Sequence, residues 1–83
     1  MSETSRTPEQ EQRIARAEAK LAAANLRLSA AQRDQMTAGY LRQMDHPVYD
    51  GQEIVCAGKA AVTQGLSDRE RAQADLIEAE AGL

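Results

Sequence analysis

An apolar pattern repeats every seven residues between positions 14 and 31. Large aliphatic side chains alternate with alanine at steps of three and four residues, through Ile14, Ala17, Leu21, Ala24, Leu28 and Ala31. This spacing places all six side chains on one stripe of a helix, and alanine lets a facing helix approach closely. We call these six residues the 14–31 seam. The pattern predicts self-association in a homodimer or a tight hetero-complex, or packing within the chain against Ala72, Leu76 and Ala79.

The composition indicates one small helical domain with a thin core. Leu, Ile and Val total 13 of the 83 residues, whereas alanine contributes 16 and Phe is absent. The net charge is only −3, so the low aliphatic content does not by itself indicate disorder. A chain this short needs a disulfide, a metal or a partner to supplement its core. Because its single cysteine cannot form an internal disulfide, we expect a partner helix and no cofactor.

The first helix is predicted to begin at Pro8 and to end before Pro47. Thr7 and Gln10 have the spacing of a capping box, with Pro8 at the first helical position. Residues 1–7 are predicted to be a disordered tail and residues 8–83 a single helical domain. Near Gln32 the apolar residues change face, so the helix either breaks there or changes partner. Pro47 disfavours a helical conformation at the residue before it.

The segment after Pro47 has two interpretations. Asp50-Gly51 is typical of a type I′ hairpin turn, but Asp50 and Glu53 also form a capping box for a helix that Gly65 would end. We favour the helix, followed by a second capping box at Ser67 and Glu70. The predicted fold is therefore all-α, with a long N-terminal helix and an antiparallel pair of short helices. The alternative is α+β, with a small hairpin around Asp50-Gly51.

Residues 61–67 resemble the turn of DNA-binding helix–turn–helix repressors. The resemblance is carried by Ala61, by Gly65 four residues later, and by the Leu66-Ser67 pair that follows. It implies a DNA-binding regulator as an alternative function. In that family aliphatic residues follow the glycine at the positions that here hold Arg71 and Asp75, and two charges do not fit that core. The acidic balance also argues against binding to phosphates.

Two sites in the sequence carry side chains of the types used for metal binding or nucleophilic catalysis. Asp45, His46, Asp50 and Glu53 lie close together, but their spacing matches no metal motif. Cys56 lies among apolar neighbours, which predicts a buried thiol rather than a nucleophile. We therefore expect neither catalysis nor metal binding.

Methionine and tyrosine side chains are concentrated near the end of the first helix. We call Met36, Tyr40, Met44 and Tyr49 the Met/Tyr patch. Such side chains either complete a core or form an adaptable recognition surface, and we predict that the patch binds a larger protein.

The sequence thus predicts a small non-catalytic interaction module that self-associates and binds or occludes a larger protein. It would act as an inhibitor or adaptor of the kind that phages supply, and an alternative is a small structural subunit such as part of a phage head–tail joint. The N-terminus has no apolar stretch of the kind found in signal peptides, and no segment is long enough to cross a bilayer. We expect a cytoplasmic protein without membrane contact.

Overall fold

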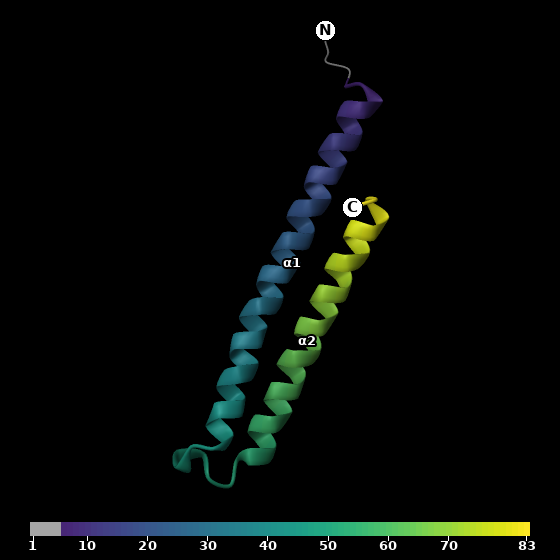
Figure 1. The fold of residues 1–83 in the computed structure, drawn as a ribbon. Coiled ribbons are helices and arrows are strands. Elements are labelled where there is room, and N and C mark those ends of the chain that lie inside the picture. The colour runs from purple at the N-terminus through teal and green to yellow at the C-terminus, as the bar shows by residue number, and fades with distance from the viewer. Residues whose placement is uncertain (1–5) are drawn as a thin grey trace.

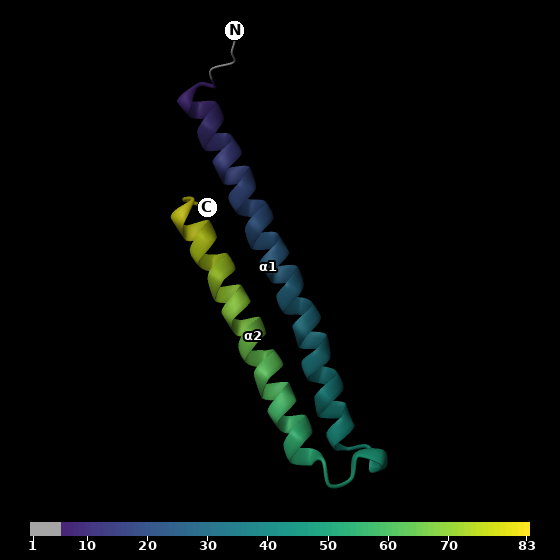
Figure 2. The ribbon, with the colours of Figure 1, turned by 180° about the vertical axis from the view of Figure 1, so that it is seen from behind.

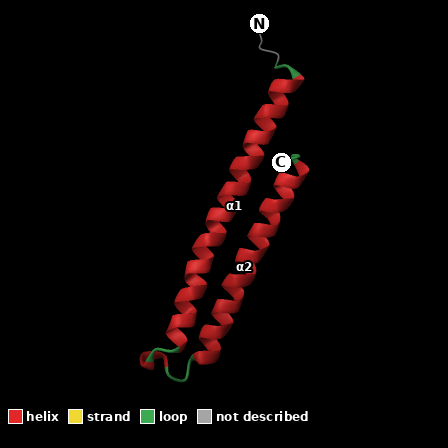
Figure 3. Ribbon diagram, in the orientation of Figure 1, coloured by secondary structure: helices red, strands yellow, loops and turns green. Residues whose placement is uncertain are grey.

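The chain folds into an antiparallel hairpin of two long helices. The computed structural model describes residues 6–83, and its elements are α1 (Pro8–Met44), a short 3₁₀ helix η1 (Pro47–Tyr49) and α2 (Glu53–Glu80). Figures 1 and 2 show the two helices side by side over most of their length, with the N-terminal part of α1 extending beyond the end of α2. The all-α class is confirmed, since residues 6–83 contain no strand (Figure 3). The expectation of disorder in residues 1–5 lies outside the described residues.

The outer ends of both helices have the local chemistry that the sequence indicates. The Gln10 amide donates to Thr7 Oγ1 at 3.1 Å and the Thr7 amide donates to Gln10 Oε1 at 3.0 Å, which confirms the capping box. At the other end, Gly82 has a φ of 75°. The Leu83 amide bonds the Glu78 carbonyl and the Gly82 amide bonds the Ala79 carbonyl, which is a Schellman motif.

Both helices are continuous, at Gln32 where the sequence left a break open and at residues 65–67 where it predicted one. α1 passes Gln32 without a break, and α2 runs through Gly65-Leu66-Ser67, where the sequence predicted a turn between two short helices. That prediction was wrong. Ser67 does not cap a helix, because its side chain is completely buried against α1. Gly65 is an ordinary helical residue, since only Gly51 and Gly82 have positive φ among the described residues.

The connection between the helices is neither a hairpin nor a helix capped by Asp50. Gln52 is the N-cap residue of α2 and makes no side-chain capping bond, so the predicted cap at Asp50 was wrong. Gly51 has a φ of 86°, which reverses the chain after η1. The Gly51 amide donates to Glu53 Oε1 at 3.3 Å, so the side chain of the first residue of α2 supports the turn from the other direction.

Small side chains form the whole buried interface between the helices. The buried residues are Ala23, Ala30 and Thr37 on α1, and Cys56, Ala60, Thr63, Ser67 and Ala74 on α2. Their heptad-like spacing keeps each set on one face of its helix. Alanine, serine and threonine allow the helix axes to approach closely, but they bury little apolar area. The hairpin is one helix thick, with extents of 68 × 23 × 13 Å.

Candidate interaction surfaces

The buried centre of the interface is polar. Thr37 Oγ1 and Thr63 Oγ1 are 2.5 Å apart, and each hydroxyl also lies within hydrogen-bonding distance of a carbonyl in its own helix. Nearby, Ser67 donates to Asp34 Oδ1 at 2.6 Å, and Arg71 donates to both oxygens of the same carboxylate. These bonds tie specific levels of α1 to specific levels of α2, so they fix the register of the hairpin.

Two further groups of ion pairs join the helices on the side away from the connecting segment, toward the C-terminus of α2. Glu70 accepts from Ser29 at 2.6 Å and from Arg33 at 2.7 Å, and Arg27 bonds both Asp75 and Glu78. The Ser29 hydroxyl and then Arg33 hold the pKa of Glu70 below its usual value.

Two other carboxylates that bridge the helices, those of Asp34 and Glu78, also have a lowered pKa. Hydrogen bonds from Arg71 and then Ser67 lower the pKa of Asp34, and the bond from Arg27 lowers that of Glu78. The charged residues along the interface therefore act as structural partners of one another.

The 14–31 seam does not take part in this interface. All six of its residues are exposed, and Leu21 and Leu28 retain 63% and 60% of their accessible area. The heptad positions of the seam lie about 150° around α1 from the buried Ala23–Ala30–Thr37 line. The suggested internal partner, the Ala72–Leu76–Ala79 face, does not cover the seam, since Leu76 is itself 58% exposed. The hairpin therefore leaves the seam open to another molecule.

A second exposed seam, which the sequence analysis missed, runs along the outside of α2. It alternates larger side chains with glycine or alanine through Val55, Gly58, Val62, Gly65, Arg69, Ala72, Leu76 and Ala79, all of them exposed. We call it the 55–79 seam. The steps of three and four residues were a visible signal. They were hidden by the interpretation of Gly65 as a helix end, which divided the pattern into two parts.

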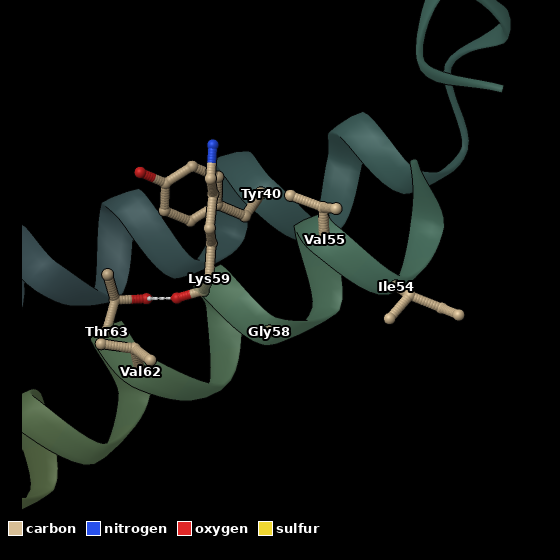
Figure 4. Close-up of a pocket in the computed structure, with 7 residues that line it drawn as sticks. All are labelled: Tyr40, Ile54, Val55, Gly58, Lys59, Val62 and Thr63. Atoms are coloured by element: carbon tan, nitrogen blue, oxygen red, sulfur yellow. Dashed lines mark hydrogen bonds between the residues drawn. The ribbon is translucent and has the colours of Figure 1, made fainter. Parts of the chain in front are cut away.

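An open groove lies over the first part of the 55–79 seam. Its lining comprises Tyr40 from α1 and Ile54, Val55, Gly58, Lys59, Val62 and Thr63 from α2. Figure 4 shows Lys59 extending alongside the Tyr40 ring, with its Nζ 5.7 Å from the ring centroid. Gly58 contributes no side chain, and space around it is open. The groove is therefore mostly apolar, with one cation at its edge.

The Met/Tyr patch is only partly gathered by the fold. Met36 and Tyr40 share a shallow depression on α1 with Gly39 and Gln43. Met44 is half-buried in the last turn of α1. Tyr49 ends η1 and packs edge-on against His46 with ring centroids 6.1 Å apart. Tyr40 alone also lines the groove over the 55–79 seam.

His46, Glu53 and Cys56, whose side chains are of types used for metal binding or nucleophilic catalysis, have local structural roles. His46 Nδ1 accepts the Val48 amide at the start of η1, and Glu53 supports the turn at Gly51. Cys56 is buried, as expected, and its thiol lies 3.9 Å from Gln43 Oε1. Among residues 6–83, no three side chains of His, Cys, Asp or Glu are grouped so that they could hold a metal ion.

Helix–turn–helix geometry is absent from the region that resembles the DNA-binding repressors, because residues 61–67 are continuous helix. No family model, curated protein or solved structure matches this chain. Within the described residues, neither helix has an apolar stretch sufficient to cross a membrane. The candidate surfaces therefore have to be assessed on their own chemistry.

Proposed function

We propose that this protein is a non-catalytic protein–protein interaction module that self-associates through the 14–31 seam, the smallest such assembly being a homodimer. One observation carries the proposal: the fully buried side chains of the hairpin are small, whereas most of its large aliphatic side chains are exposed and only Leu26, Leu66 and Ile77 are half-buried. Full burial of a Leu, Ile or Val side chain contributes roughly 1.5 to 3 kcal/mol. Since Leu21, Leu28, Val62 and Leu76 are each more than half exposed, most of that contribution is available only from another chain.

Sedimentation velocity over a wide concentration range tests the proposal. We expect the wild-type chain to show a mass that increases with concentration. Leu28→Glu should remain a monomer, because it would bury an unpaired carboxylate at the contact. Gln12→Glu adds the same charge to an exposed position of α1 outside the seam and should associate like wild type. A wild-type chain that stays monomeric throughout would contradict the proposal.

Recognition of a larger protein target by the Met/Tyr patch is the second part of the proposed function. It is supported by Met36 and Tyr40, which together line the depression on α1. The module would then act as an inhibitor or adaptor of the kind that phages supply. A small structural subunit, such as part of a phage head–tail joint, is the alternative. Copurification from host lysate with wild-type and Tyr40→Ala chains tests this part. A target retained equally by both chains would exclude the patch.

A further inference from the structure

The two exposed seams have the same alternation and lie on opposite edges of the hairpin. Each is about 150° around its helix from the buried interface, and the antiparallel arrangement directs them away from each other. A neighbouring molecule can therefore cover one seam and leave the other free.

We infer that the 14–31 seam of one copy docks antiparallel against the 55–79 seam of a second copy. This inference rests on the proposed self-association and identifies the surface that receives the 14–31 seam. Its occupant is another copy of this chain, and three features support it: side-chain size, flanking charge and helix length.

Side-chain sizes are complementary in one register of this contact. In an antiparallel pair, each large seam residue faces a small one of the other helix. One register places every large aliphatic of both seams opposite alanine or glycine. The large residues of the 14–31 seam face small ones of the 55–79 seam: Ile14 faces Ala79, Leu21 faces Ala72 and Leu28 faces Gly65. In return Leu76 faces Ala17, Val62 faces Ala31, and Val55 faces Ala38, a half-buried alanine seven residues beyond the end of the 14–31 seam. Arg69 falls opposite Ala24, where its aliphatic stem can cover the alanine while its guanidinium stays in water.

The charges beside the seams are complementary in the same register. The residues immediately before the large positions of α1 are basic, at Arg13, Lys20 and Arg27. On α2 they are acidic before two of the four large positions, at Asp68 and Asp75, and uncharged before the other two. Lys20 would lie beside Asp75 of the second copy, and Arg27 beside Asp68. Asp75 keeps 75% of its side chain exposed despite its pair with Arg27, so it can accept a second cation. The like-charged pair of Glu11 and Glu80 falls at the solvent-exposed end.

A second copy of α1 is a poorer partner for the 14–31 seam. In an antiparallel α1 pair, Lys20 would lie beside Arg27 of the copy, and like charges at a contact are unfavourable. In a parallel pair, leucine would face leucine at one level and alanine would face alanine at the next. Those levels require different distances between the helix axes, so the alanine levels would leave gaps.

The unequal helix lengths also fit this contact. Residues 8–18 of α1 are all exposed and extend past the end of α2 (Figure 1). Within the hairpin Thr63 is level with Thr37. In the proposed register Thr63 of the second copy is level with Ala30, a displacement of about 10 Å toward the N-terminus of α1. The neighbouring α2 therefore covers much of the extension. In a pair of copies, the 14–31 seam of one copy and the 55–79 seam of the other remain uncovered. Further copies can dock on these two seams, so association continues beyond two copies.

Mixing two singly blocked variants tests the head-to-tail contact. Leu28→Glu blocks the 14–31 seam and Val62→Glu blocks the 55–79 seam, while both sites are exposed in the hairpin, so helical content should be unchanged. We expect each variant alone to sediment as a monomer and the equimolar mixture to form a complex of two chains. Gln12→Glu adds the same charge to an exposed position of α1 outside both seams and should associate like wild type.

Other outcomes separate this inference from the proposed function. If Leu28→Glu is monomeric but Val62→Glu associates like wild type, the chain self-associates through α1 alone and the head-to-tail contact is wrong. The same conclusion follows if the two blocked variants are monomeric and stay so when mixed. If the wild-type chain is itself monomeric, both the inference and the proposed self-association fail.

Charge reversal at Lys20 tests the register within that mixture. On the Val62→Glu chain, Lys20→Glu lies beside the 14–31 seam, which forms the contact in the mixture. It should weaken the complex by about three- to tenfold through repulsion from Asp75. The same substitution on the Leu28→Glu chain lies in the blocked seam and should leave affinity unchanged. Equal effects in the two chains, or no effect in either, would overturn the proposed register.

Discussion

Gly51 is the residue at which the connection depends most on a single backbone conformation. Its φ of 86° lies in the left-handed region, where a side chain costs about 1 to 2 kcal/mol. We expect Gly51→Ala to lower the free energy of unfolding by about that amount. Asp50→Ala should have little effect, because Asp50 is not the N-cap of α2. Urea denaturation followed by circular dichroism measures both variants, and equal losses would contradict this account.

Ser67 shows where local sequence patterns stop being informative. Thr7 with Gln10 and Ser67 with Glu70 both have capping-box spacing, yet only the first pair caps a helix. The difference lies on α1, where Asp34 accepts the Ser67 hydroxyl. A bond between residues 33 positions apart cannot be recognised from the four-residue pattern of a capping box. The helix start at Thr7 was therefore predictable from adjacent residues, whereas the continuity of α2 through Ser67 was not.

At the scale of the helices, the hairpin depends on the small size of its interface residues. Ala30 is completely buried against α2, whereas its neighbour Ala31 is exposed. We expect Ala30→Leu to destabilise the hairpin by about 1 to 3 kcal/mol, because the larger side chain forces the helices apart. Ala31→Leu introduces the same side chain on the outside and should leave the hairpin unchanged at concentrations where the chain is monomeric. Thermal unfolding of both variants tests this difference, and equal melting temperatures would refute it.

The ion pairs between the helices make hairpin stability depend on pH. Asp34, Glu70 and Glu78 all have a pKa below the usual value in the folded chain, through bonds from Arg71, Ser29 and Arg27. A lowered folded pKa means that the unfolded chain binds protons more readily, so acid favours unfolding. Their contribution is complete above the unfolded pKa values, near 4, and is lost as pH falls through the lower folded values.

We therefore expect the urea midpoint to be steady near neutral pH and to fall below about pH 4.5. Glu70→Gln should flatten this acid dependence, since it removes one of the shifted groups. Glu9→Gln removes an exposed carboxylate in the first turn of α1, outside the interface between the helices, and is the matched control. An acid profile that Glu70→Gln leaves unaltered would show that this carboxylate does not carry the dependence.

The helical pattern was easier to predict than the face that each helix buries. The 14–31 seam was correctly placed on one stripe, but periodicity cannot show whether a stripe faces the same chain or another one. The interface signal was present in the spacing of Ala23, Ala30 and Thr37. Small and polar residues carry little weight when hydrophobicity is used to predict burial, so the larger aliphatics dominated the interpretation. The second seam was missed for a related reason, because two of its small positions are glycine.

For the whole molecule, the proposed self-association would connect stability with concentration. The fully buried apolar side chains are four alanines and one cysteine among residues 6–83, so the isolated hairpin has a limited hydrophobic contribution. Any association that buries the seams stabilises the folded state by mass action, because the unfolded chain does not present a continuous seam. Folding and assembly are therefore expected to be linked rather than sequential.

This linkage predicts a melting temperature that rises with protein concentration. Binding at 100 times the dissociation constant adds about 2.7 kcal/mol, which for a domain of this size shifts the melting temperature by roughly 10 to 20 °C. Thermal melts by circular dichroism over a dilution series measure this slope. Leu28→Glu should melt at one temperature throughout the series, close to that of dilute wild type, because Leu28 contributes to the association surface and not to the hairpin interface. If the wild-type melting temperature does not change with concentration, the aliphatic residues outside the hairpin are not buried by self-association, and their contribution has to come from a different protein.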